Sequence, residues 1–334
     1  MPPLESWPSL PKVSVLVAAW NEADHIDRHI RSFLDLRYPY KELVLCAGGE
    51  DGTYHLATHY AGEQVNLLEQ LPGEGKQRAL RKAFPYASGE IIFLTDADCL
   101  LNSESFERLL YPLIIRDATV ATGVSRPYAN KQKNPFILHQ WSPQRYNEIF
   151  LTSQYSKGLL GRNCALNRDA IEKAWESRQK VTTGTDYYLA LRVLESGRKI
   201  RYIPESFVET RFPTSSNQYI RQQTRWLRNL LMWGSGFGDW YHVSHAIKTS
   251  MIGITLLLMP LSVLAHGKVG LLFWWISWGA VLGTRTRYVK IVAHSEEETF
   301  HLAPINLLKI MVNDFIAWGR VLFDIWQVNL KERW

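Results

Sequence analysis

The sequence predicts an α/β protein with a doubly wound sheet, followed by a hydrophobic, mostly helical C-terminal part. Two observations lead to this fold class. Apolar runs typical of buried strands alternate with helical segments through the first part of the chain, as in repeated strand, helix, strand units. At 334 residues the chain also exceeds one average domain, which fits one α/β domain with an appendage.

Strand and helix candidates alternate in the first part. The strands are expected over residues 13–19, 42–47, 90–96 and 120–124, each mostly apolar. The helices are expected over residues 23–36, 52–61, 76–87 and 103–115, with Ser103 as the N-cap of the last. No internal repeat argues for a different architecture.

The C-terminal part contains two uncharged stretches. The first covers residues 249–267 and, with 19 residues, is long enough to span a bilayer. The second covers residues 269–284 and is interpreted as a thin span, a re-entrant segment or a core helix. Basic residues follow it and favour a hairpin that returns to the cytoplasmic side. They are Arg285, Arg287 and Lys290.

A last helix is expected over residues 303–328. Polar residues recur there at steps of three, four or seven, which places them on one narrow stripe of an otherwise apolar helix. The stripe consists of Asn306, Lys309, Asn313, Arg320, Asp324 and Gln327. This pattern suits a helix that lies in a membrane interface. The alternatives are a surface helix packed on the first domain and a helix that lines a membrane bundle.

The composition of the chain indicates its cellular compartment and its classes of partner. The formal net charge of +6 is modest and its basic residues are scattered among acids, so no nucleic-acid surface is indicated. Thirteen Trp residues, many of them beyond position 225, suit a membrane interface or a sugar-stacking surface. Cys46, Cys99 and Cys164 have no zinc or disulfide spacing, which indicates buried thiols in a reducing compartment. The N-terminus has no secretory signal pattern, so the first domain should stay in the cytoplasm.

A pair of acidic residues ends the third expected strand. The run IIFLTDAD places Asp96 and Asp98 at the carboxyl end of a buried strand, where open α/β sheets bind ligands. Two carboxylates at this spacing can hold a hard divalent cation, and a cation bridged to phosphates takes such oxygen ligands. A nucleotide-sugar diphosphate is therefore the expected ligand. The alternative for an isolated pair is a polar turn that ends a strand.

Two further signatures follow in order. Asp186 lies in TGTDYYLALRVLESG, 88 positions after Asp98, and Gln222 opens a Gln-x-x-Arg-Trp motif another 36 positions on, with Arg225 and Trp226. Chance rarely keeps such an order, so together the signatures indicate a sugar-transfer site. Taken alone, Asp186 is equally an acid that caps a helix, and Trp226 an anchor at a membrane interface.

These motifs resemble those of the inverting family 2 glycosyltransferases, in the branch of cellulose, chitin and hyaluronan synthases and ceramide glucosyltransferase. The resemblance covers roughly residues 11–230. VSVLVAAWNEADHI is similar to the family's first strand and turn, and PGEGKQRALRKAF resembles the stretch that lines the donor pocket. GLLGRNCALNRDAI is similar to the segment beside the acceptor, and the run ending in IRQQTRWLRN resembles the approach to the Gln-x-x-Arg-Trp helix.

The resemblance implies a Rossmann-like GT-A catalytic domain over residues 1–240 and a membrane-associated region over residues 241–334. It implies that the donor is bound by Ala18, Asn21, Glu22, Asp51, Gly75, Lys76, Asp96 and Arg225, and the acceptor by Gly161, Asn163, Gln222 and Trp226. Asp96 and Asp98 would hold Mg²⁺ or Mn²⁺ on the diphosphate. Asp186 is the hypothetical general base, and Arg225 adds a planar positive group for the diphosphate.

Two departures from the family pattern affect the expected site. The usual Asp-Asp-Gly-Ser run is Cys46-Ala47-Gly48-Gly49 here, so the acid that commonly contacts the base is absent, and Glu50 or Asp51 is the candidate substitute. Thr185 replaces the usual Glu before Asp186. Uridine remains the nucleotide that the resemblance implies.

The sequence therefore predicts a membrane-attached, metal-dependent, inverting enzyme that moves a sugar from a UDP-sugar to a lipid-linked or saccharide acceptor. One or two spans offer no polymer channel, which favours single transfer over the alternative of a processive polysaccharide synthase. A non-catalytic nucleotide-sugar-binding or scaffold protein is the alternative from another class. Membrane lipid is an expected partner and nucleic acid is not, with the catalytic domain on the cytoplasmic face of a bacterial inner membrane or an equivalent membrane.

Overall fold

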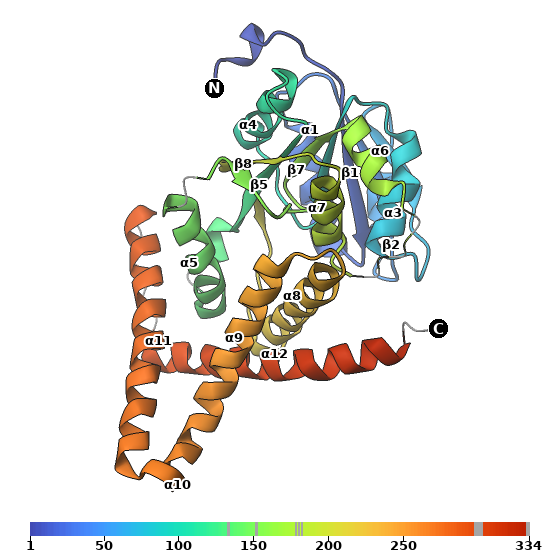
Figure 1. Cartoon of the computed structure of the whole chain (residues 1–334). Coiled ribbons are helices and arrows are strands. Elements are labelled where there is room, and N and C mark those ends of the chain that lie inside the picture. Colours follow the sequence, from blue (N-terminus) through green and yellow to red (C-terminus); the bar gives the residue numbers. More distant parts are fainter. Residues whose placement is uncertain are drawn as a thin grey trace. The chain divides into compact units, whose positions relative to one another are not determined.

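The computed structural model describes residues 1–131, 134–150, 153–177, 179, 181, 183–296 and 303–331. The chain divides into two compact units. The first comprises Met1–Tyr128 and Thr152–Arg211, and the second Ala129–Leu151 and Phe212–Trp334. A sheet forms the centre of the first unit, whereas the second is helical (Figure 1).

The sheet of the first unit is mixed, with the strand order β3-β2-β1-β4-β7-β5-β8-β6. Its strands are β1 (Val13–Trp20), β2 (Lys41–Gly48), β3 (Val65–Glu69), β4 (Ile91–Asp96), β5 (Val120–Pro127), β6 (Tyr155–Ser156), β7 (Cys164–Asn167) and β8 (Ile200–Thr210). The first four strands along the chain pair in parallel, whereas β7 runs antiparallel to both of its neighbours, β4 and β5. Because parallel strands end at one edge, the turns after β1, β2 and β4 lie together.

Helices cover both faces of this sheet. They are α1 (Ala23–Leu34), α2 (Thr53–Thr58), α3 (Gly75–Ala83), α4 (Ser103–Ile114), α6 (Arg168–Trp175) and α7 (Thr185–Glu195). Successive residues of β1 enter different cores, since Val15 and Val17 pack with α1 and α4, while Leu16 packs with α3 and α6. The alternation of side chains along a strand therefore produces the predicted two-sided α/β architecture.

The predicted elements are confirmed, with two corrections at helix ends. Asn102 rather than Ser103 is the N-cap of α4, because the Asn102 side chain accepts a hydrogen bond from the Ser105 backbone N–H at 2.9 Å. α3 ends at Ala83 rather than Ala87, and a 3₁₀ turn with Pro85 follows it. Proline has no N–H to continue the helical hydrogen bonds. The three cysteines are free and buried, as predicted.

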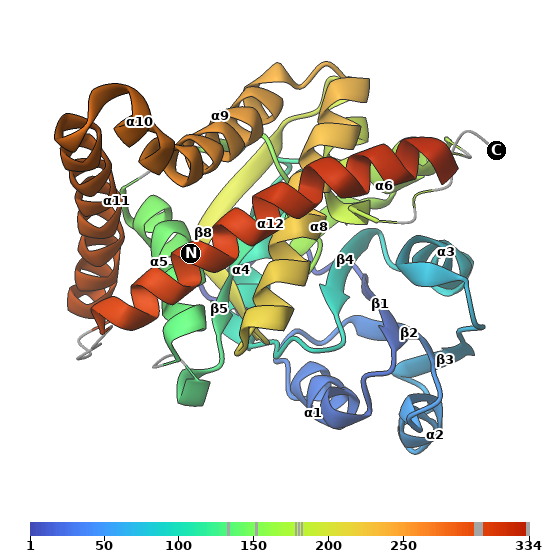
Figure 2. The same ribbon diagram turned by 90° about the horizontal axis from the view of Figure 1, so that it is seen from below.

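The second unit is built from helices. They are α5 (Pro135–Phe150), α8 (Ser216–Gly236), α9 (Trp240–Leu258), α10 (Val263–His266), α11 (Lys268–Ser295) and α12 (Pro304–Lys331). Leu227 of α8, Ala246 of α9 and Val321 of α12 form a shared buried cluster. Figure 2 shows α12 lying across α8 and α9.

The predicted bilayer spans are not supported. Residues 249–267 do not form one helix, because α9 ends at Leu258 and a 3₁₀ turn, Met259–Ser262, contains Pro260. Residues 269–284 are the first part of α11, which continues to Ser295. In the part of the chain that the structure describes, no helix has the length and the apolar character needed to cross a bilayer.

The helix predicted over residues 303–328 exists as α12, and its predicted polar stripe is exposed at Lys309 and Arg320 but buried at Asn313. Asn313 is buried and donates a hydrogen bond to Ser216 Oγ at 3.1 Å. The exposed side chains include Ile305, Leu308, Val312 and Ile316. Packing against α8 thus turns part of the polar stripe inward. The side chains of Asp324 and Gln327 lie outside the described part of the chain.

Candidate active site

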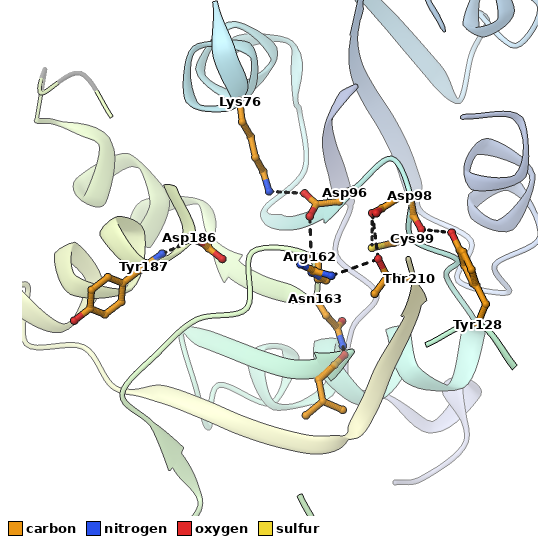
Figure 3. Close-up of polar contacts among 11 residues, drawn as sticks. Lys76, Asp96, Asp98, Cys99, Tyr128, Arg162, Asn163, Asp186, Tyr187 and Thr210 are labelled. Carbon is orange, nitrogen blue, oxygen red and sulfur yellow. Dashed lines mark hydrogen bonds and ion pairs between the residues drawn. The ribbon is translucent and has the colours of Figure 1, made fainter. Parts of the chain in front are cut away.

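The candidate site forms where β1 and β4 end. Ala18 of β1 pairs in register with Asp96, the last residue of β4. Asp98 follows in the turn that leads to α4. Figure 3 shows Asp96 and Asp98 with Lys76 and Arg162 around them. The sheet thus places the predicted acidic pair at its ligand-binding edge.

Asp96 lies between two cations. Lys76 Nζ donates a short hydrogen bond to Asp96 Oδ1, and Arg162 Nε lies 3.9 Å from Oδ2. Burial raises the pKa of Asp96, but Lys76 and Arg162 outweigh burial and hold it below its ordinary value. Burial likewise lowers the pKa of Lys76, while Asp96 and Asp186 raise it above the ordinary value. All three groups are therefore charged at neutral pH.

The glycine before Lys76 allows this placement. Gly75 begins α3 with a φ of +66°, a left-handed conformation that side chains disfavour. The chain can thus turn sharply into the helix and direct Lys76 toward the end of β4. The structure supports the grouping of Gly75 and Lys76 with Asp96 that the sequence predicts.

Asp98 is held through neighbours that the sequence analysis did not single out. Thr210 Oγ1 donates to Asp98 Oδ1 at 3.2 Å, and Arg162 Nη1 donates to Thr210 at 3.4 Å. Tyr128 donates a short hydrogen bond to the Asp98 backbone carbonyl. Within the described chain, the second carboxylate oxygen of Asp98 has no hydrogen-bond or ion-pair partner. One oxygen therefore remains for a ligand.

The two carboxylates fit a divalent cation that is shared with a phosphate ligand. No group of three or more His, Cys, Asp or Glu side chains in the described residues is placed to hold a metal by itself. Mg²⁺ and related cations need no such cage, since one or two carboxylates together with substrate phosphates and water complete their coordination. Asp98 offers a free oxygen, and Asp96 would join it once Lys76 moves to a phosphate.

Asp186 lies in the first turn of α7, after Gly184 with a φ of +69°. Its Oδ1 accepts a hydrogen bond from the Tyr187 backbone N–H at 3.0 Å, and the helix N-terminus favours a negative charge there. Gly161 packs directly on this residue, because a Cβ at Gly161 would lie 2.6 Å from Asp186 Cβ. The absence of a side chain at Gly161 thus leaves space for Asp186. This packing role is separate from the acceptor contact predicted for Gly161.

Asn163 is a framework residue in the structure. Its side chain is only 1% exposed, and its Nδ2 donates to the carbonyls of Val124 and Ser206, each at 3.0 Å. These bonds bridge β5 and β8 where Gly123 makes a bulge, and a Cβ at Gly123 would lie 2.2 Å from Asn163 Nδ2. The amide nitrogen is thus bonded to backbone, and the acceptor contact expected for Asn163 remains a prediction.

The turns after β1 and β2 are tied to each other. Asp51 accepts hydrogen bonds from the backbone N–H groups of Ala23 at 2.9 Å and Thr53 at 3.0 Å, one on each carboxylate oxygen. Asn21, with a φ of +56°, accepts one from the Glu50 N–H at 2.9 Å. Asp51 therefore holds two turns together, and its role as a substitute contact to the base remains a prediction.

Glu22 is the acidic residue of this turn that faces the pair. Burial, and after it the charge of Asp98, raise its pKa from 4.5 to about 7. One of its carboxylate oxygens is buried without a partner in the described chain. Glu22 thus lies close enough to the acidic pair to be disfavoured in its charged form, and its contact with the donor remains a prediction.

The sequence analysis missed three residues of the site: Arg162, Tyr128 and Thr210. Arg162 lies between Gly161 and Asn163, which were both selected, and its guanidinium is the one that meets Asp96 and Thr210. The available signal was its position inside GLLGRNCALNRDAI, the segment that the resemblance places beside the acceptor. Tyr128 directly follows β5 and Thr210 is the last residue of β8, and only the strand order brings them to Asp98.

The Gln-x-x-Arg-Trp residues lie on α8 of the second unit. Gln222, Arg225 and Trp226 are three and four residues apart and so share one face of the helix. Arg225 and Trp226 are exposed, and Arg225 has no ion-pair partner among the described residues. Their predicted contacts with diphosphate and acceptor remain predictions.

The Rossmann-like sheet, with a carboxylate pair at the end of β4 and a further acid at the start of α7, has the GT-A fold. The chain belongs to the glycosyltransferase like family 2, whose model matches residues 11–229. The resemblance inferred from the motifs is thereby confirmed.

Curated relatives agree with this family. The chain is 26% identical over 245 residues to the probable glycosyltransferase YdaM of Bacillus subtilis, covering 67% of this chain and 56% of the relative. It is 27% identical over 232 residues to the beta-monoglucosyldiacylglycerol synthase of Trichormus variabilis, covering 65% and 48%. The chain spans about half the length of these relatives.

Solved structures confirm the fold. The mannosyltransferase PcManGT from Pyrobaculum calidifontis, in complex with GDP-Man and Mn²⁺, is similar with a TM-score of 0.59 at 18% identity, covering 95% of this chain and 88% of that one. GalNAc-T7 with UDP, GalNAc and Mn²⁺ gives a TM-score of 0.50 at 17% identity, covering 71% and 51%. At these identities the likeness concerns the fold alone.

Proposed function

We propose that this chain is a metal-dependent, inverting glycosyltransferase that transfers a sugar from a UDP-sugar to a lipid-linked or saccharide acceptor. One observation carries the proposal. Asp96, Asp98 and Asp186 share a site with Lys76 and Arg162, and the charge of Asp186 acts on both cations. Such a cluster of acids and bases in a family 2 domain suits the departure of a diphosphate.

The charges of the cluster match a metal diphosphate. The three carboxylates and two cations sum to one net negative charge. A divalent cation bound together with a diphosphate would change this net charge little. When bound, the cation would act as a Lewis acid on the leaving diphosphate. Asp98 and Asp96 would hold it. Lys76 would turn from Asp96 to a phosphate oxygen, and Arg162 would keep Asp98 in place through Thr210.

Asp186 would act as the general base. One carboxylate oxygen accepts the Tyr187 N–H, which orients the group and leaves the other for the acceptor hydroxyl. Removal of the hydroxyl proton as the oxygen attacks the anomeric carbon gives inversion, since the diphosphate leaves from the opposite face. Close packing on Gly161 fixes the base, and misplaced catalytic groups lose much of their effect.

The acceptor and the location are further parts of the proposal. A relative named as a beta-monoglucosyldiacylglycerol synthase supports a lipid acceptor, although this chain spans about half of it. We place the enzyme at a membrane, with the catalytic unit on the cytoplasmic face. Single transfer is the preferred mode, and product length on a lipid and a saccharide acceptor tests it against processive synthesis.

The test is release of nucleoside diphosphate by the detergent-purified chain from a panel of UDP- and GDP-sugars, with Mg²⁺, Mn²⁺ or EDTA. Release should need the metal and should fall about 10²-fold to 10⁴-fold in Asp186→Asn, the range of a general base. Asp117→Asn, an exposed acid outside the site, should keep full activity. NMR of the product's anomeric proton tests inversion.

Two results would overturn the proposal. No release from any donor, even with membrane lipids added, favours the binding-protein alternative. Full release by Asp186→Asn removes this residue as the base.

A further inference from the structure

A groove in the second unit has no part in the site described above. It has a volume of about 790 Å³ and lies between the end of α5 and the second half of α11. Its lining residues are Phe150, Gly283, Thr286, Arg287, Lys290, Ile291 and His294. Those from α11 are spaced by one, three or four positions, so they form one face of the helix.

The groove is basic and its lining has no carboxylate. Arg287 and Lys290 have no ion-pair partner within the described residues. The neighbouring Arg285 differs, since its Nη2 lies 3.8 Å from Asp314 Oδ2. Two uncompensated cations beside an apolar wall of Phe150 and Ile291 suit a ligand that carries both a phosphate and an apolar part.

The sequence around the groove extends this charge pattern. The 56 residues from Trp240 to Ser295 contain no Asp or Glu and five Lys or Arg. Among the described residues near the groove, Glu148 and Glu296 are already paired, because Arg145 lies 3.2 Å from Glu148 and 2.7 Å from Glu296. A negatively charged partner would therefore meet no opposing carboxylate along this stretch.

The first half of α11 and the turn before it expose apolar side chains. Leu264 is 87% exposed and Trp275 is 66% exposed. We call this surface the apolar hairpin; it consists of Leu258, Leu261, Leu264, Val269, Leu271, Leu272, Phe273, Trp275 and Ile276. Figure 1 shows α9 and α11 as the arms of a hairpin closed by α10. A contiguous surface of this kind marks a site of contact with a protein or a membrane.

We propose that the groove binds the phosphate of an anionic membrane lipid while the apolar hairpin enters the same leaflet. The spacing along α11 agrees with this occupant. Trp275 and Arg287 are 12 residues apart, about 18 Å along a helix. Val269, nearer the turn, is 18 residues or about 27 Å from Arg287. This length exceeds the roughly 15 Å depth of hydrocarbon in one leaflet, so α11 would enter the leaflet obliquely. A second copy of the chain would bring basic surfaces together, whereas anionic lipid neutralises them.

This inference deepens the proposed membrane attachment by naming the surface and the lipid class. Its test needs neither donor nor acceptor, so it can succeed or fail independently of sugar transfer.

The test is co-sedimentation of the full chain with phosphatidylcholine vesicles and with vesicles that also contain phosphatidylglycerol. Binding to anionic vesicles should exceed binding to neutral ones and weaken as salt is added. The double variant Arg287→Gln, Lys290→Gln should bind anionic vesicles about 25-fold more weakly, since each basic residue near such a surface contributes about fivefold. Its binding to neutral vesicles should not change.

Matched variants distinguish the contribution of charge from that of apolar contact. Added inorganic phosphate distinguishes binding of lipid phosphate from binding of free phosphate. Arg116→Gln with Lys173→Gln removes the same charge from exposed positions of the first unit and should bind like the parent. Leu272→Ser with Trp275→Ser should weaken binding to both vesicle types without changing the thermal midpoint, because both side chains are exposed. Millimolar inorganic phosphate at constant ionic strength should not displace the chain from the vesicles.

Three outcomes would overturn the inference. They are equal binding by the Arg287, Lys290 variant and the parent, displacement by inorganic phosphate, and a dimer that is lost in the Leu272, Trp275 variant without any vesicle binding. The last would make the apolar hairpin an interface between copies.

Discussion

The two units place a carboxylate among cations and hydroxyls in opposite settings. In the first unit Asp96 stands at the end of a strand, ion-paired with Lys76 and Arg162, and its side chain is 28% exposed. In the second unit Asp314 is buried within helices and is reached by Tyr219 and His139. The open arrangement can exchange a partner for a ligand, whereas the closed one joins elements of the framework.

The closed network involves four helices. Tyr219 of α8 donates to Asp314 of α12 at 2.7 Å, and His139 of α5 lies 3.2 Å from it. Arg285 of α11 lies 3.8 Å away. Burial lowers the pKa of His139, so the ring is neutral at neutral pH and bonds as an uncharged group. The pKa of Asp314 stays below its ordinary value because His139 and Arg285 outweigh burial.

The largest effect should follow from Gly161→Ala, which tests whether the open site depends on close packing. A Cβ 2.6 Å from Asp186 Cβ forces the base to shift, and such a displacement costs about 100-fold in kcat. Steady-state release of nucleoside diphosphate measures it. Gly158→Ala is the control, since a Cβ there meets nothing within 4 Å. Equal kcat values for the two variants would contradict the packing role.

Asp314→Asn should lower stability and leave kcat unchanged, the reverse of the effect expected for Gly161→Ala. Loss of the charge weakens the bonds from Tyr219 and His139, and we expect about 2 kcal/mol of lost stability, roughly a 30-fold change in the folding equilibrium. Urea denaturation measures it, with the exposed Asp35→Asn as control. The kcat per folded molecule should not change. A tenfold loss of kcat without loss of stability would move Asp314 from framework to site.

Arg162→Lys should have a smaller effect, confined to the open site. Lysine keeps the charge but loses the forked contact with Asp96 and Thr210, which should lower kcat/KM for the donor about tenfold. Donor kinetics and a thermal melt together test this. Arg198→Lys, whose ion pair with Asp169 lies outside the site at 2.8 Å, should behave like the parent. An unchanged kcat/KM would make Arg162 dispensable.

Glu22→Gln should give the smallest effect, visible as pH dependence. The pKa of Glu22 is about 7 in the folded chain against 4.5 unfolded, so the charge is disfavoured by folding. The neutral carboxyl of Glu22 contributes fully to folding stability below about pH 4.5, and this contribution is lost as the pH rises to about 7. The thermal midpoint of Glu22→Gln, measured with EDTA, should thus rise relative to the parent across that range and then level off. Glu50→Gln, an exposed neighbour, should show a constant difference, and a parallel course for both variants would refute the idea.

Much of the first unit could be predicted because its signals are local. Apolar runs gave β1, β2, β4 and β5, and the position of Asp96 and Asp98 at a strand end followed from the sequence alone. The short strands β3 and β7 carry no comparable run. The predicted C-terminal spans were wrong because they rested on hydropathy alone. An uncharged stretch can still contain a residue that ends a helix, as Pro260 does.

The sequence by itself determined the family, the α/β order of elements and the acids at the site, because periodicity and motif spacing encode them within a few residues. Tertiary structure decided which partners these acids have. Thr210 reaches Asp98 from 112 positions away, Gly161 meets Asp186 through packing, and β7 enters the sheet antiparallel beside β4. Such contacts depend on strand order and on helix packing, and local patterns do not specify either one.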